Sequence, residues 1–193
     1  MKKVIIAAAL ILLSTTAAYA DGLCGARLSN DELVGNYTIE LGPGTLTAIT
    51  ENGGQRVHPV PLRAGTATIA LYDGVPVLFS DDIADGGVLE IALTLAGGSD
   101  ADLAFLDDPA FPTASADDLS DVLGCDTAFD LPRLTGTGSV KGNGVVVPNA
   151  SQLMIFNQND GGISAIGVYD STFSPPGSGG TVVFHVRIAI SSI

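Results

Sequence analysis

The sequence T-V-V-F-H-V-R-I-A-I, from Thr181 to Ile190, places apolar side chains at every second position. Polar or small residues fill most of the places between them, and only Val183 blurs the alternation. Because successive side chains of a β-strand point to opposite faces, this pattern predicts a strand with one buried face and one wetter face. A long half-buried strand needs a sheet that curls or is covered. The segment therefore predicts an all-β fold.

Segments with similar alternation recur along the chain, separated by turn residues. About 8–10 strands arranged in this way are typical of an antiparallel up-and-down β-barrel or a sandwich, and the tight turns favour the barrel. Gly42-Pro43-Gly44 is a predicted turn that folds Thr45–Thr50 back as a hairpin, and Glu51 to Gly54 is a second turn. The strands are expected at Leu33–Leu41, Thr45–Thr50, Thr66–Tyr72, Val75–Ser80, Val88–Leu95, Leu134–Val140, Gly144–Val147, Ser151–Asn157, Ile163–Phe173 and Thr181–Ile190.

Helical signals occur at two places. Residues 29–32, Ser-Asn-Asp-Glu, are typical of a capped helical turn. One short helix is predicted in the middle of the chain, where Ser115 is the candidate N-cap, Leu119, Val122 and Leu123 form an apolar stripe, and Gly124 is a stop signal.

The first 20 residues have the pattern of a cleaved signal peptide. Lys2 and Lys3 precede the apolar run from Val4 to Leu13, and Ala18-Tyr19-Ala20 matches a small-x-small cleavage site. The run is too short to cross a bilayer comfortably. We therefore expect a periplasmic or extracellular protein of bacterial type, with residues 21–193 forming a single all-β domain.

Removal of Lys2 and Lys3 would leave six basic residues against 21 acidic ones, a net charge of −15. Nucleic acids and anionic membrane surfaces are bound by clustered Lys and Arg, so this charge argues against both as partners.

The only two cysteines, Cys24 and Cys125, most simply form one structural disulfide in an exported protein. A redox pair or a metal site is the alternative. Neither cysteine lies in a C-x-x-C motif, and two thiols without nearby histidines make a poor zinc site.

The stretch Leu33-Val34-Gly35-Asn36-Tyr37, preceded by a helical turn, resembles the opening of lipocalin-like (calycin) barrels. In that family a glycine, followed two residues later by an aromatic residue, starts the first strand. Tyr37 stands here where the family usually has tryptophan. The resemblance implies a barrel with a central cavity for a small apolar molecule.

No motif assigns an activity, and we expect no catalytic, cofactor-binding or metal-binding residues. His58, expected in a loop, and His185, on the wetter face of the last strand, are interpreted as surface residues, and no G-x-S-x-G motif is present. The chain has few aromatic residues and no tryptophan, which weakens glycosidase and lectin interpretations. No glycine-rich phosphate loop is present.

Acidic loops raise the possibility of calcium binding. Asp81, Asp82 and Asp85 form one cluster, and further clusters lie within 100–108 and 157–160. None has the ligand spacing of an EF-hand loop, so ordinary turns are the main interpretation.

The leading hypothesis is an exported, non-enzymatic β-barrel that binds a small apolar ligand or a protein partner. The alternative is a structural or cell-surface interaction module that uses its acidic loops, with or without calcium. An unrecognised hydrolase is a third hypothesis. Five aromatic residues are candidates to line a cavity or fill the core, namely Phe79, Phe105, Phe111, Phe129 and Tyr169.

Overall fold

The computed structural model describes residues 28–84, 86–96, 132–142, 144–159 and 162–193. These residues form one 3-10 turn and nine β-strands. The elements are η1 (Asn30–Leu33), β1 (Gly35–Ile49), β2 (Gln55–Val60), β3 (Arg63–Tyr72), β4 (Val75–Ala84), β5 (Gly87–Ala96), β6 (Arg133–Gly142), β7 (Val145–Asn159), β8 (Gly162–Phe173) and β9 (Thr181–Ser192). Among the described residues, no helix has the length and apolar character needed to cross a membrane.

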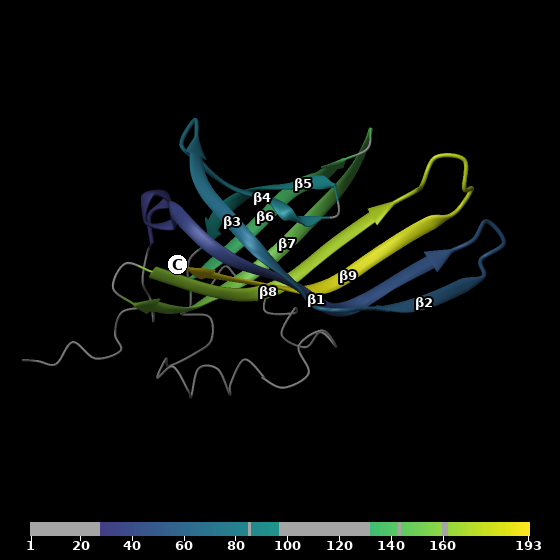
Figure 1. The fold of residues 1–193 in the computed structure, drawn as a ribbon, viewed down its shortest axis with the longest axis horizontal. Helices are drawn as coiled ribbons and strands as arrows, with labels where there is room; N and C mark the ends of the chain where they lie inside the picture. The colour runs from purple at the N-terminus through teal and green to yellow at the C-terminus, as the bar shows by residue number, and fades with distance from the viewer. Residues whose placement is uncertain (1–27, 85, 97–131, 143, 160–161) are drawn as a thin grey trace, which may run out of the picture.

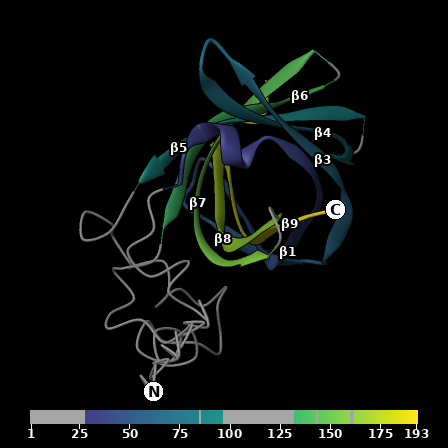
Figure 2. The same ribbon diagram turned by 90° about the vertical axis from the view of Figure 1, so that its left-hand side faces the viewer.

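The strands form one antiparallel sheet that closes on itself. Their order is β2-β1-β3-β4-β5-β6-β7-β8-β9, and an additional pairing joins β1 to β9. β2 lies outside the ring, so eight strands make the closed barrel. Figures 1 and 2 show the ring from the side and from the end that carries η1. The predicted all-β, up-and-down barrel is confirmed.

The first predicted hairpin is wrong, because β1 does not reverse at Gly42-Pro43-Gly44. Gly42 has a φ of 95°, and the register of β1 against β9 shifts between Leu41 and Gly44. The three residues therefore form a β-bulge, which bends a strand without ending it. Beyond the bulge, Gly44–Ile49 of β1 still pairs with β9 on one side and pairs with β2 on the other. The chain reverses only at the second predicted turn, where Thr50 N–H donates to the Gly54 carbonyl at 2.8 Å.

Two predicted strands are one strand in the structure. Val145–Val147 of the first and all of the second, Ser151–Asn157, belong to the continuous β7, which runs through Pro148. Pairing with β8 starts only at Ala150, so Pro148 lies where one edge of β7 has no neighbouring strand. A strand tolerates proline at such a position, because no ladder hydrogen bond is lost there.

The barrel interior is a continuous apolar core. In β9, the alternation of the sequence is reproduced, since Val186, Ile188 and Ile190 are buried. The same period-two pattern brings one face of each barrel strand inside. The buried cluster includes Tyr37, Ile39, Ala67, Ile69, Leu78, Leu89, Ile91, Leu93, Leu134, Leu153, Ile155, Ile163, Ala165, Tyr169, Val186, Ile188 and Ile190.

The two ends of the barrel differ. The predicted helical turn is present as η1, where Ser29 N–H and Oγ both donate to the Glu32 carboxylate, at 2.6 and 2.9 Å. η1 buries Leu33 completely, and the Tyr37 hydroxyl donates to the Leu33 carbonyl at 2.7 Å. At the other end β1, β2, β8 and β9 extend beyond the ring, on the right of Figure 1. We call this end, with its β4–β5, β6–β7 and β8–β9 hairpins, the open end.

Asp82 holds together the edges of β3 and β4 where regular pairing stops. Its carboxylate accepts hydrogen bonds from the Thr66 backbone N–H at 2.9–3.0 Å, from Thr66 Oγ1 at 2.9 Å and from Ser80 Oγ at 3.0 Å. Gly65 leaves room for it, since a Cβ there would overlap the carboxylate. The hydrogen bonds from Thr66, backbone first, lower the pKa of Asp82 below its usual 3.8.

Asp82 therefore predicts an acid-dependent loss of stability. A lowered folded-state pKa means that the stabilisation is present above the unfolded-state pKa and is lost as pH falls through the folded-state value. We expect Asp82→Asn to melt at a lower temperature than the native protein at neutral pH. The two melting temperatures should converge as pH falls below about 4. Thermal melts across this range measure the effect. A difference that stays constant with pH would contradict it.

Candidate functional site

The open end of the barrel contains an apolar cavity of about 390 Å³. Its wall is assembled from β1, β2, β3, β4, β6, β8 and β9, so it exists only once the sheet has closed. The bulge in β1 positions two residues of this wall. It bends the strand while keeping both Leu41 and Leu46 on the inner face of the sheet. The main apolar side chains are Leu41, Leu46, Val60, Ile83, Val140 and Phe184.

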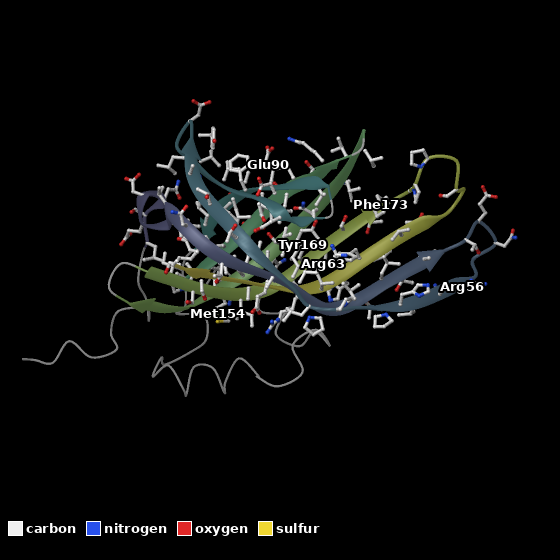
Figure 3. All side chains as sticks on the ribbon, in the orientation of Figure 1. Arg56, Arg63, Glu90, Met154, Tyr169 and Phe173 are labelled. Carbon is white, nitrogen blue, oxygen red and sulfur yellow. The ribbon has the colours of Figure 1, made fainter. Side chains whose placement is uncertain are left out.

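Three polar residues join this wall: His58, Arg63 and Tyr169. His58 is opposite Leu46 in the β1–β2 register, so both side chains are on the same face of the sheet. Figure 3 labels Arg63 and Tyr169 near the middle of the molecule, where the ring opens into the extension. A mainly apolar wall with a few polar groups is typical of small-molecule binding sites.

Tyr169 is the one cavity residue with a strongly shifted pKa. Its side chain is 3% exposed, and its ring meets that of Phe184 edge-on, with the centroids 6.0 Å apart. Burial raises the pKa of Tyr169 to about 12, because the phenolate would lose its hydration. At physiological pH this hydroxyl is neutral, and it is available to donate or accept a hydrogen bond.

The shifted pKa of Tyr169 predicts alkaline instability. Since the folded-state pKa lies above the unfolded value of 10.0, the stabilisation is complete below pH 10 and is lost as pH rises towards 12. Spectrophotometric titration should show a late tyrosinate step in the folded protein that disappears in Tyr169→Phe. Tyr37, whose pKa is also raised by burial, should keep its own late step in this variant. A titration in which Tyr169→Phe removes only an ordinary tyrosine step would contradict the assignment.

Two further polar side chains lie inside the barrel beside Tyr169. Asn149 and Ser151 are 8% and 3% exposed, and both project from the inner face of β7. Asn149 lies close enough to the Tyr169 hydroxyl to oppose the rise in the pKa of Tyr169, but the contact does not have hydrogen-bond geometry. Within the described residues, neither amide atom of Asn149 nor the Ser151 hydroxyl has a hydrogen-bond partner.

The two histidines lie on different strands and in different surroundings. His58 was expected in a loop, but it lies in β2, because the chain reverses after β1 has already passed the bulge. His185 is on the outer face of β9, where its Nδ1 contacts the Asp170 carboxylate. The wetter face predicted for His185 is confirmed.

The aromatic residues proposed to line a cavity or fill the core have different positions in the structure. Tyr169 lines the cavity, whereas Phe79 faces outward and packs edge-on against Tyr72, with centroids 5.4 Å apart. Phe105, Phe111 and Phe129 lie outside the described residues. A second hollow, of about 330 Å³, lies over Phe79 on the outside of the barrel, but it is more open and polar threonines line it.

Several predictions fall on parts of the chain that the structure does not describe. They are the signal peptide, the Cys24–Cys125 disulfide, the helix after Ser115, the acidic cluster at 100–108, and the residues Asp85 and Asp160 of the other two acidic clusters. Asp82 belongs to the first predicted calcium loop, and its carboxylate binds Thr66 and Ser80. In the described ranges, no group of three or more His, Cys, Asp or Glu side chains is placed to hold a metal ion.

Apart from Tyr169, the residues of the cavity wall carry no local sequence pattern that predicts a binding site. The available signal was on β7, where Asn149 and Ser151 occupy the same alternating positions as the inward-facing Leu153 and Ile155. Polar residues on an otherwise apolar face indicate a buried polar site. No protein-family model matches this chain, and comparison with curated proteins and with solved structures gives no match either.

Proposed function

We propose that this protein is an exported, non-enzymatic β-barrel that binds a small apolar ligand in the cavity at its open end. The observation that carries the proposal is the cavity itself, at about 390 Å³ with a mainly apolar wall. Ligand sites generally occupy about 300–1,000 Å³. An apolar molecule that enters loses contact with water, which favours binding by about 25 cal/mol for each Å² buried.

Two features support a binding role of this kind. The cavity opens between hairpins at one end of a barrel, and barrel mouths are a common location of ligand sites. The stretch from Leu33 to Tyr37 is similar to the start of lipocalin-like barrels, a family that encloses small apolar molecules. The pattern of the first 20 residues supports the export part of the proposal.

A fluorescent apolar probe tests the proposal. N-phenyl-1-naphthylamine fluoresces weakly in water and strongly in apolar surroundings, and the absence of tryptophan keeps the background low. We expect saturable fluorescence enhancement at one probe for each chain, lost when the protein is unfolded. A folded protein that produces no saturable enhancement would refute the proposal.

A further inference from the structure

We propose that the ligand is an amphiphile that inserts with an uncharged polar group first, and that Asn149, Ser151 and Tyr169 bind this group inside the barrel. This inference rests on the proposed function and adds the chemical class and orientation of the ligand. The three residues are called the inner polar cluster below.

The inner polar cluster adjoins the cavity. Tyr169 belongs to both. Asn149 is on β7, the strand between β6 and β8, and these two neighbours supply Val140 and Tyr169 to the cavity wall. Ser151 is directly opposite Tyr169 in the β7–β8 register. Asn149 and Ser151 therefore lie directly behind the part of the cavity wall that Val140 and Tyr169 form.

The sequence makes space for this cluster. Asn149 and Ser151 are opposite Gly138 and Gly136 of β6, on the inner face of the sheet. A Cβ at Gly136 would overlap both the Ser151 hydroxyl and the Ile91 side chain. Gly136 thus accommodates the Ser151 hydroxyl in a core that is otherwise filled by Leu and Ile.

The hydrogen-bonding state of the cluster indicates a ligand. Buried polar groups in native proteins nearly always have partners, and a buried group without one costs about 1–3 kcal/mol. Within the described residues, Asn149 and Ser151 have none. Their neighbour Ser171 is equally buried but donates to the Pro148 carbonyl at 2.6 Å. The unpaired atoms of β7 are thus those of Asn149 and Ser151, beside the cavity residue Tyr169.

The absence of charge in the inner polar cluster indicates which polar group of a ligand it can bind. Asn149 offers a donor and an acceptor, and the Ser151 and Tyr169 hydroxyls can act as either. None of the three carries a charge, and a buried carboxylate or ammonium without a charged partner would be strongly disfavoured. A hydroxyl, carbonyl or amide group satisfies the cluster, with the apolar body of the ligand against Leu46 and Phe184.

Competition binding tests the inference. 1-Decanol and 1-chlorodecane have the same chain, but only the alcohol forms good hydrogen bonds, and each is titrated against bound N-phenyl-1-naphthylamine. The preference for decanol over chlorodecane is compared between the native protein and Asn149→Leu or Ser151→Ala. We expect each variant to reduce this preference by about tenfold, through a loss of affinity for decanol. Asn149→Leu should also melt at the same or a higher temperature, since it removes unpaired buried atoms.

Ser171→Ala is the matched control, because it removes a buried hydroxyl that already has a partner. It should destabilise the protein and leave the preference for decanol unchanged. If the protein binds the probe but neither cluster variant alters the preference for decanol over chlorodecane, this inference is overturned and the proposed function remains. Absence of probe binding to the native protein would refute the proposed function. A preference for decanoate over decanol that is lost in Arg63→Gln would place the polar group at the cavity rim and overturn the orientation.

Discussion

Gly167→Ala should destabilise the barrel by about 3 kcal/mol or more, measured by chemical denaturation. Gly167 is in β8 opposite Leu153, and a Cβ there would overlap the backbone carbonyl oxygen of Gln152 in β7. A flexible side chain could move aside, but a carbonyl within a strand pair cannot move without breaking the pairing. The closed ring would transmit this displacement to β9, which β8 also pairs.

Gly35→Ala is the matched control within a strand. The nearest atom to a Cβ at Gly35 is Tyr37 Cε2 at 3.7 Å, an ordinary van der Waals contact. We expect this variant to change the free energy of unfolding by less than about 0.5 kcal/mol. Equal destabilisation by the two substitutions would contradict the close β7–β8 packing described above.

Leu46→Trp should weaken probe binding strongly, with at least a tenfold loss of affinity for N-phenyl-1-naphthylamine. Leu46 lies on the cavity wall and is only partly buried, so a larger side chain can fill the cavity without entering the closed core. A ligand would then have to displace the indole ring, which would itself be packed against apolar side chains. Fluorescence titration measures the loss, with the probe excited outside the absorption of the new tryptophan.

Thr47→Trp is the control for this change. Thr47 is the next residue of β1, so its side chain points to the opposite face of the sheet. It introduces the same ring outside the cavity, and probe affinity should stay within about twofold of the native value. Equal losses in the two variants would show that the probe binds elsewhere.

Local patterning was sufficient to predict the fold class. The alternation from Thr181 to Ile190 and the turn residues between strands reflect the preferences of short segments, and these survive in β9 and its neighbours. The capped turn at Ser29 to Glu32 was also predictable, because its hydrogen bonds join residues three apart. Such features depend little on the rest of the molecule.

The path of β1 and the cavity could not be predicted in the same way. Gly-Pro-Gly favours a turn locally, but β1 continues through it because β9 and β2 provide partners on both sides of Gly44–Ile49. The pairing of Leu46 with Phe184 joins segments far apart in the sequence. Cavity residues are neighbours only after this closure, so alternation within a single strand cannot identify them.

Native mass spectrometry of the purified protein tests ligand binding most directly. The spectrum is recorded before and after incubation with N-phenyl-1-naphthylamine, for the native protein and for Leu46→Trp. We predict one bound molecule for each native chain, either co-purified or acquired from the probe, that is lost on denaturation and much less abundant in Leu46→Trp. A native chain that carries no bound molecule under either condition, or a probe adduct equally abundant in Leu46→Trp, would contradict the binding site at the open end.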